Sequence, residues 1–309
     1  MAGALEGPPT LCVVDGHGQL YRSFHAIKEL SRSDGHPTNG TYGFFRSLLK
    51  TLRDIRPTHL AVAFDAKGPT FRDELFEDYK ANRPPMPDSL RVQVGDVIDV
   101  ISSLSVPILQ VEKFESDDCM ATAARWAEKR GWRCVLVTTD KDMLQLVNER
   151  VVVYNPAKRT MVQPVDVRER MGVDPEQVVD LLALCGDPTD AIPGVPGVGP
   201  KTAVKILERH GSVEELSSYI RSGGEQDAAV KKVSSHLEEL QRWREMVVLR
   251  SDVDLELEED KLALGRAEPE DVRVALGRLE MTSLTDEVVG LFCDSIPLLE
   301  GIDLGRGGD

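Results

Sequence analysis

Glu115-Ser116-Asp117-Asp118 brings three carboxylates together, a few residues after an apolar run, residues 106–111, and directly before a helical pattern that begins at Cys119. The apolar run is typical of a short buried strand, so these acids lie where a strand ends and a helix begins. Helix capping explains one or two of them, because the N-terminus of a helix favours negative charge. Capping does not explain why the same arrangement returns elsewhere in the chain.

Three further apolar runs, at residues 11–14, 60–64 and 134–137, also lead into acids, and these are Asp15, Asp65, Asp140 and Asp142. In an open parallel α/β sheet, the active crevice lies outside the carboxyl ends of the strands. The acids should therefore gather at one rim, where like charges need a counter-charge to stay ionised. Divalent cations bound through oxygen supply that charge. A lone acid at a strand end is often structural, but four such ends in one chain favour a metal site.

The order of the patterns predicts the fold class. Strand-like runs alternate with helical ones, such as the amphipathic segment 41–56, as far as a fifth strand at residues 151–154. Such alternation indicates an α/β fold with a mainly parallel central sheet flanked by helices. We expect this α/β domain at residues 10–170, followed by a helical domain at residues 171–300. Residues 1–9 and 301–309 are predicted to be flexible tails.

The composition excludes some classes of protein. The cysteines (Cys12, Cys119, Cys134, Cys185 and Cys293) form no CxxC pair, which argues against zinc or disulfides and favours a reducing cytoplasm. No apolar run approaches the roughly 18 residues of a membrane span, and residues 1–9 do not resemble a secretory signal. The net charge of −15 speaks at first sight against nucleic acid. The candidate ligands and an acidic stretch at residues 250–271 carry much of that charge, so it decides little.

A long stretch rich in charge and proline, residues 66–88, follows the second strand. No steady period holds there, and long irregular segments in compact domains are usually functional or disordered. It carries the basic and aromatic residues Arg72, Tyr79, Lys80 and Arg83.

A second unusual stretch, residues 192–203, combines glycine and proline and follows the acids Asp187 and Asp190. It nearly spells a phosphate-binding P-loop, but one residue intrudes before the lysine and no strand precedes it, as that motif requires. What remains is a tight glycine turn that opens a helix at residues 201–209. The basic residues Lys201, Lys205 and Arg209 are spaced along one face of that helix. The turn is either an ordinary packing corner or a phosphate-backbone site, and the basic face favours the second.

Several segments together resemble the 5′-nuclease domain of bacterial DNA polymerase I, and these are residues 14–17, 21–26, 64–67, 71–72, 79–83, 115–118, 139–142, 180–184 and 186–195. The match runs in order from about residue 10 to residue 250. The chain is similar to the flap endonuclease / 5′–3′ exonuclease family, as a stand-alone protein. The resemblance implies a PIN-like nuclease core, a helical arch at residues 67–88 and a helix–hairpin–helix at residues 187–210.

The resemblance also implies the site residues. One metal group comprises Asp15, Asp65, Glu115, Asp117 and Asp118; the second comprises Asp140, Asp142, Asp187 and Asp190. The expected cofactors are two Mg²⁺ or Mn²⁺ ions, with a K⁺ ion at the glycine turn. The expected catalytic residues are Lys80 and Arg83 of the arch with Asp15, Asp65 and Asp118. The expected DNA contacts are Tyr21, which stacks on a base, with Arg22, Arg72, Tyr79, Gly197, Gly199, Lys201, Thr202 and Lys205.

The sequence departs from the family pattern at two positions. Ala191 stands where the family usually has Asn after the last acid, and Ser116 stands where Ala is usual. The first departure puts support for Asp190 in doubt, but neither removes a ligand. His17 and His25 are interpreted as helix-face or supporting residues rather than general bases.

The expected function is a structure-specific 5′-nuclease that cleaves DNA by a two-metal-ion mechanism in replication and repair. Its partners would be DNA with 5′ flaps, nicks or free 5′ ends, and it would act as a cytoplasmic monomer with a functional link to a polymerase. One alternative is an RNA-directed nuclease on the same acidic core. The other is a non-catalytic module that binds duplex DNA, although such a protein should have lost some of the nine acids.

Overall fold

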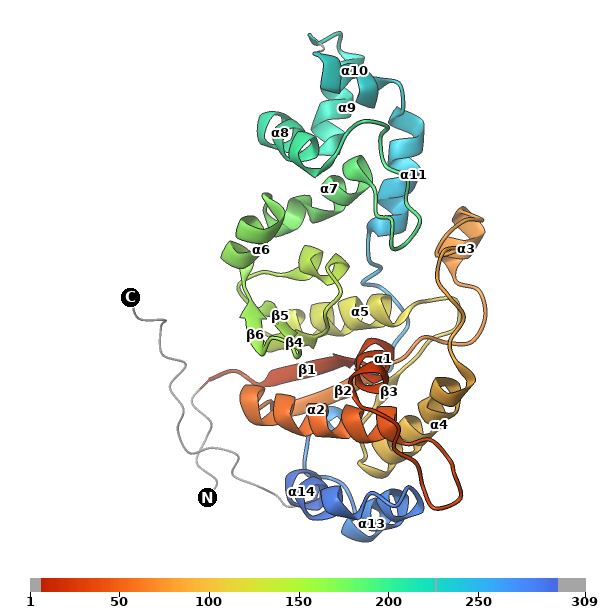
Figure 1. The fold of residues 1–309 in the computed structure, drawn as a ribbon. Coiled ribbons are helices and arrows are strands. Elements are labelled where there is room, and N and C mark those ends of the chain that lie inside the picture. Colours follow the sequence, from red (N-terminus) through yellow and green to blue (C-terminus); the bar gives the residue numbers. More distant parts are fainter. Residues whose placement is uncertain (1–6, 226, 294–309) are drawn as a thin grey trace.

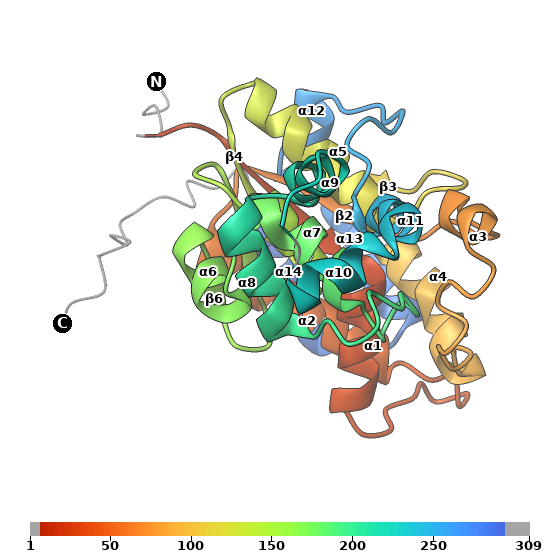
Figure 2. The ribbon, with the colours of Figure 1, turned by 90° about the horizontal axis from the view of Figure 1, so that it is seen from above.

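The computed structural model describes residues 7–225 and 227–293. Two flexible tails were predicted. Most of the first, at residues 1–9, and all of the second, at residues 301–309, lie outside the described residues. The described chain forms an elongated molecule in which a sheet with its helices lies below a group of helices (Figure 1). Viewed from above, α7 and its neighbours overlie the strands (Figure 2).

The sheet confirms the predicted α/β class. Its strand order is β3-β2-β1-β4-β5-β6. Parallel pairing joins all neighbours except β5 and β6, which are antiparallel. The strands are β1 (Thr10–Asp15), β2 (His59–Ala63), β3 (Ile108–Leu109), β4 (Arg133–Val137), β5 (Val151–Asn155) and β6 (Thr160–Val162). β3 is shorter than the predicted run 106–111, and the edge strand β6 was not predicted.

Alternation along the central strands divides the core into two layers. Leu11, Val13 and Ala61 belong to one buried cluster, whereas Cys12, Val14 and their neighbours belong to the other. Successive side chains of a strand point to opposite faces, so a continuous apolar run is buried on both. This burial explains why these strands read as unbroken hydrophobic stretches.

Helices cover both faces of the sheet. α5 packs against β1, β2 and β4 on one face, whereas α2 and α4 pack together in the cluster of the other face. The helices of this part are α1 (Gly16–Ala26), α2 (Asn39–Ile55), α3 (Phe71–Leu75), α4 (Asp88–Ser103) and α5 (Ser116–Lys129), followed by the 3₁₀ turn η1 (Asp142–Leu146). The short helix α3 lies inside the segment predicted to be irregular.

The helical region predicted at residues 171–300 is divided in space. Just before it, α6 (Pro164–Met171) contacts β6 and η2. The first part of the region lies on the side of the sheet that α5 covers, and contains η2 (Pro175–Gln177), α7 (Val178–Cys185), α8 (Pro200–His210), α9 (Val213–Arg221), α10 (Ala228–Ser234) and α11 (Leu237–Val247). The chain then returns past β2, where Ala263 pairs with His59, through α12 (Glu259–Leu262). Finally, α13 (Pro269–Arg278) and α14 (Thr282–Phe292) pack on α4 and α2, at the bottom of Figure 1.

In the structure, α13 and α14 thus pack apart from the helices around α7, whereas the sequence predicted one helical domain at residues 171–300. This separate packing could not be predicted from the sequence, because the helices of both groups are amphipathic. None of the helices among the described residues is long and apolar enough to cross a membrane.

Candidate active site

Asp15 lies at the end of β1, the strand between β2 and β4 at which the strand order reverses. It ends β1 and caps α1: its Oδ1 accepts from the Gly18 N–H at 2.8 Å and its Oδ2 from the Thr138 hydroxyl at 3.0 Å. A Cβ at position 18 would lie 2.1 Å from Asp15 Oδ2, so the cap needs glycine there. Burial, together with repulsion from Asp65 and Asp140, raises the pKa of Asp15.

Asp65 follows β2 and meets the N-terminus of α5. Its Oδ1 accepts from the Ser116 N–H at 2.8 Å, and His17 Nδ1 lies 3.3 Å from its Oδ2. Burial opposes ionisation, but His17 and the Ser116 N–H outweigh it and hold the pKa of Asp65 below its usual range. His17 therefore supports a carboxylate, in agreement with the supporting role predicted for it.

Asp117 lies in the first turn of α5. Burial raises its pKa well above the usual value, and repulsion from Asp140 and Asp15 adds to this effect. Acids from β1, α5 and the end of β4 therefore act on one another electrostatically.

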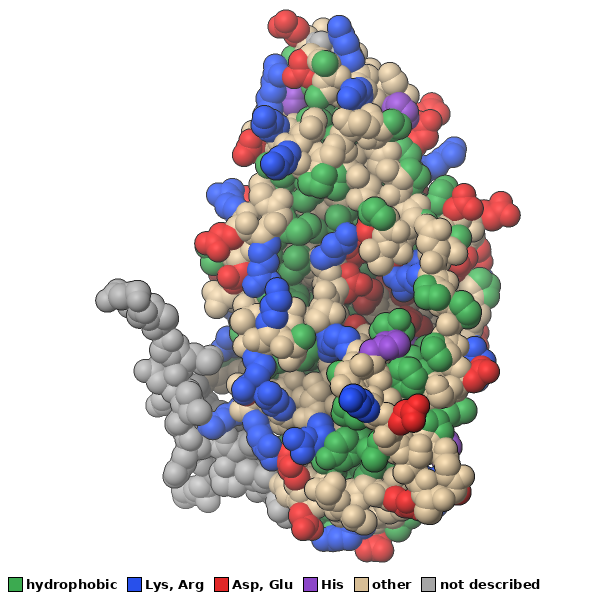
Figure 3. Space-filling view, viewed as in Figure 1, with side chains coloured by type: hydrophobic (Ala, Val, Ile, Leu, Met, Phe, Trp, Pro, Cys, Tyr) green, Lys and Arg blue, Asp and Glu red, His purple; other side chains and the backbone are tan. Residues whose placement is uncertain are grey.

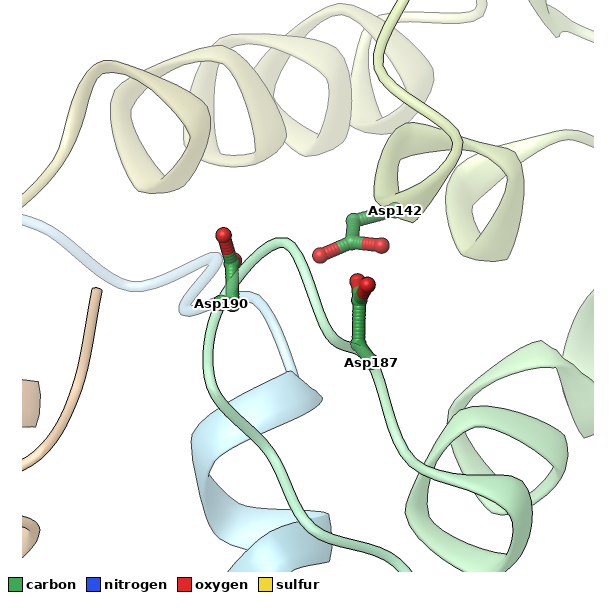
Figure 4. Close-up of side chains that lie close together, drawn as sticks. All are labelled: Asp142, Asp187 and Asp190. Atoms are coloured by element: carbon green, nitrogen blue, oxygen red, sulfur yellow. The ribbon is translucent and has the colours of Figure 1, made fainter. Parts of the chain in front are cut away.

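Asp142, Asp187 and Asp190 form a second group, in which ligand atoms from all three lie within 4.8 Å of one another (Figure 4). Asp142 comes from η1, whereas Asp187 and Asp190 lie in a tight turn closed by reciprocal backbone bonds of 2.9 Å between Asp187 and Ile192. Burial and repulsion from neighbouring acids raise the pKa of Asp142 well above its usual value. Asp142 Oδ1 is buried and, among the described residues, has no hydrogen-bond partner.

Basic residues of the arch contact both groups of acids. The Lys80 ammonium donates to Glu115 Oε1. The Arg83 guanidinium donates to Asp190 Oδ1 at 2.6 Å, and the Lys80 N–H donates to the Asp190 carbonyl at 3.2 Å. The arch segment is therefore tied to the turn that carries Asp190, although the two are far apart in sequence.

Arg72 has a different place from the one predicted. Its side chain is 1% exposed and binds Asp118, which is 0% exposed, through two parallel bonds of 2.7 and 2.8 Å. The guanidinium also donates to Glu115 and to the Met246 and Val248 carbonyls. The side chain was predicted to contact DNA, but here it is buried and all three of its nitrogen atoms donate within the chain.

Tyr79 is likewise buried, at 6% exposed, and its hydroxyl donates to Glu115 Oε2 at 3.0 Å. The structure thus gives Tyr79 a partner within the chain, where the sequence predicted a contact with DNA. By contrast, Tyr21 is 48% exposed and packs against His25. Arg22 donates to the Thr139 hydroxyl at 3.1 Å, which places it between α1 and the end of β4.

The glycine turn lies at the start of α8. Gly194 has a φ of +67°, and a Cβ there would lie 2.2 Å from the Gly186 nitrogen, so the turn packs directly on the end of α7. Gly197, Gly199, Lys201 and Lys205 are exposed and Thr202 is partly exposed. Arg209, the third basic residue of the predicted face, is exposed and pairs with Asp227 at 3.0 Å.

The charges separate on the surface. In Figure 3, Lys and Arg side chains follow the left edge of the molecule from the helical part to the α/β part, and carboxylates lie recessed near the centre. The net charge of −15 thus conceals a basic margin beside an acidic hollow.

Two residues of the site were missed from the sequence. The Lys141 ammonium donates to Asp187 Oδ1 at 2.8 Å, and the Thr138 hydroxyl donates to Asp15. The available signal was their position: both lie in the short segment that contains Asp140 and Asp142, where a cation and a hydroxyl can reach neighbouring acids.

Comparison with known proteins agrees with this geometry. Residues 10–172 match the family model "5'-3' exonuclease, N-terminal resolvase-like domain", and residues 173–270 match "5'-3' exonuclease, C-terminal SAM fold". The chain is 38% identical over 283 residues to a 5′–3′ exonuclease of Aquifex aeolicus, covering 92% of this chain and 96% of the relative. It is 41% identical over 302 residues to the thermostable DNA polymerase I of Thermus thermophilus, covering 97% of this chain but 35% of the polymerase.

A solved structure has the same fold. The bacteriophage T5 flap endonuclease, in a complex with DNA and metal ions, superimposes with a TM-score of 0.66 at 20% identity, covering 91% of this chain and 98% of the phage protein. The fold is therefore the PIN-like nuclease fold with a helical C-terminal part. Together with the two family models, which cover residues 10–270, these relatives confirm the resemblance, and the chain belongs to the 5′–3′ exonuclease family.

Proposed function

We propose that the chain is a structure-specific 5′-nuclease that cleaves DNA phosphodiester bonds with two divalent metal ions, acting as a 5′–3′ exonuclease and a 5′-flap endonuclease. The observation that carries this proposal is the crowding of carboxylates at the carboxyl ends of the strands. Within it, Asp142 Oδ1 is buried without a hydrogen-bond partner among the described residues. A buried, unsatisfied carboxylate oxygen beside two further acids fits an oxygen-liganded cation such as Mg²⁺ or Mn²⁺.

The ligands would come from two groups. Asp15, Asp65, Glu115 and Asp117 would hold one ion, and Asp140, Asp142, Asp187 and Asp190 the other. We assign Asp118 a positioning role instead, because both of its oxygens are bound by buried Arg72. Bound divalent ions lower the pKa of water and neutralise charge on a leaving oxygen.

The residues of the chain supply the rest of the chemistry. Lys80 and Arg83 contact Glu115 and Asp190, so their charges already lie beside the proposed ligands. With Glu115 and Asp190 engaged in holding the ions, Lys80 and Arg83 would be free to contact a scissile phosphate. Fixed positive charge at that point stabilises the charge that develops on the transferring phosphoryl group. Exposed Tyr21 would stack on a base beside the cut, and Arg22 would contact the strand nearby.

Duplex binding is assigned to the glycine turn, which we interpret as part of a helix–hairpin–helix. The exposed backbone of Gly197 and Gly199 and the start of α8 offer N–H groups to a phosphate. Thr202, Lys201 and Lys205 follow on the same helix. These contacts would hold the duplex by its backbone without reading its sequence.

The proposed partners are DNA molecules with 5′ flaps, nicks or free 5′ ends. We further propose a cytoplasmic monomer with a functional link to a DNA polymerase, since relatives include polymerases that contain a matching segment.

The test is cleavage of a duplex with a 5′ flap, labelled at its 5′ end, with Mg²⁺, with Mn²⁺ and with EDTA. We expect metal-dependent release of short products and of the intact flap. Activity that survives EDTA would contradict the metal mechanism. Preferred cleavage of single-stranded RNA would instead favour an RNA-directed nuclease, and binding without cleavage would indicate a non-catalytic module.

A further inference from the structure

The carbonyl of the glycine turn already has a cationic partner. Gly197 has a φ of +73°, and its carbonyl oxygen accepts a hydrogen bond from the Lys232 ammonium at 3.1 Å. A Cβ at position 197 would lie 2.7 Å from Lys232 Nζ. Glycine is needed here because the backbone adopts a left-handed conformation, whereas the flexible Lys232 side chain could move aside for a Cβ.

The helix that carries Lys232 is fixed to α8 at a second point. Asp227 caps α10 by accepting from the Ala229 and Val230 N–H groups at 2.9 Å. The same residue pairs with Arg209, near the far end of α8. Between these points, Val230 and Val233 are buried in the cluster that contains Ala203 and Ile206 of α8. α10 is therefore braced along α8, which holds the backbone of Lys232 beside the turn.

This arrangement disagrees with the K⁺ ion predicted at the glycine turn. Carbonyl oxygens bind cations as ligands, and a Lys ammonium is a compact point charge with three donors. The ammonium and a metal ion cannot occupy the same position against the Gly197 carbonyl. The Lys232 side chain therefore supplies the positive charge at the turn that a bound cation would otherwise supply.

We infer that the Lys232 ammonium takes the place of a monovalent cation at the glycine turn, so that the turn binds a DNA phosphate backbone without potassium. This inference rests on the proposed role of the turn in duplex binding. The ligand is the phosphodiester of a duplex, and the positive charge beside it belongs to α10 instead of to the solvent.

The experiment measures binding of a blunt labelled duplex in EDTA by fluorescence anisotropy. Potassium chloride is compared with tetramethylammonium chloride at one ionic strength. Lys232→Ala is matched with Lys231→Ala, which removes the same charge from an exposed neighbour on the same helix. Wild-type affinity should agree within about twofold between the two salts, because ionic strength sets the counterion term. In tetramethylammonium, Lys232→Ala should bind about fivefold more weakly than Lys231→Ala, the loss expected from one hydrogen bond.

Potassium should restore most of the Lys232→Ala affinity, because the carbonyl is then open to the ion. The inference is overturned if the wild-type chain itself requires potassium, or if Lys232→Ala and Lys231→Ala behave alike in both salts. The double change Lys201→Ala with Lys205→Ala separates this result from the proposed function. If that variant binds duplex as well as wild type, the turn is not the duplex site, whatever the cation results.

Discussion

Asp118 and Asp142 are both buried aspartates of the predicted metal site, yet their surroundings differ completely. Asp118 accepts from the Arg72 guanidinium through both oxygens and also from the Arg250 N–H at 2.9 Å. Asp142 has a buried oxygen without a hydrogen-bond partner among the described residues and lies beside two further acids. One carboxylate is satisfied by the protein, and the other is not.

The difference separates structural acids from functional ones. A buried charge is tolerated when it is paired and hydrogen-bonded, as Asp118 is. A buried acid with a raised pKa and an unsatisfied oxygen is a candidate for binding something from outside the chain. The sequence predicted that both residues are metal ligands. The contacts instead favour a structural role for Asp118 and a ligand role for Asp142.

The largest expected effect is on stability, from Arg72→Met. Removing one partner of a buried ion pair leaves the other charge uncompensated, which costs about 3–5 kcal/mol. Arg72 also joins the arch to the Met246 carbonyl at 2.8 Å, so the loss should fall on the whole fold. Urea unfolding in EDTA measures it.

A double variant sharpens this test. Arg72→Met with Asp118→Leu removes both charges, and such replacements of buried pairs are often neutral, so much of the stability should return. Asp118→Asn gives the opposite check. If it lowers Mg²⁺ affinity without lowering the free energy of unfolding, Asp118 is a metal ligand and the comparison fails.

The sequence predicted the sheet and the rim because those depend on local patterns. Apolar runs that end in acids predict strands, and parallel pairing then brings Asp15, Asp65 and Asp140 together. The burial of Arg72 could not be predicted in this way, since its partners include a carbonyl 174 positions along the chain. A basic residue in a proline-rich segment looks the same whether it faces DNA or a buried carboxylate.

The second prediction concerns Asp142→Asn. Losing one group that holds charge at a reacting centre should slow single-turnover cleavage by about 10²–10³-fold. In EDTA the same change should raise the melting temperature, because it removes one of three crowded carboxylates. Added Mg²⁺ should stabilise the wild type more than the variant.

Glu149→Gln is the matched control, since Glu149 is exposed and lies nearby in sequence. It should change neither the cleavage rate nor the response to Mg²⁺. If Asp142→Asn lowers stability in EDTA, its carboxylate is already satisfied and the contrast with Asp118 disappears.

The third prediction concerns Lys80 of the arch, whose partner Glu115 is shared with the buried Arg72. Lys80 pairs with Glu115, which Arg72 also contacts. Lys80→Ala should slow cleavage by about 10²-fold, the scale of one electrostatic donor, with little change in duplex affinity. Lys113→Ala, which removes an exposed charge near the base of the arch, should leave the rate unchanged. A Lys80→Ala variant that loses affinity instead of rate would make Lys80 a binding residue.

The smallest effect should come from Ala191, which follows Asp190 and has a φ of +59°. A left-handed conformation costs a residue with a Cβ roughly 1–2 kcal/mol. Glycine removes this cost but loses more chain entropy on folding, about 0.5–1 kcal/mol. Ala191→Gly should therefore stabilise the chain by a net of about 0.5–1 kcal/mol in urea unfolding. Asn tolerates the same conformation, so Ala191→Asn should be at least as stable. Ala191→Val should destabilise the chain, because a β-branched residue is a true outlier at positive φ.

If Gly and Asn both lower stability, the turn does not hold residue 191 in this conformation. The unsatisfied state of Asp142 would then reflect a looser turn instead of a site prepared for a cation.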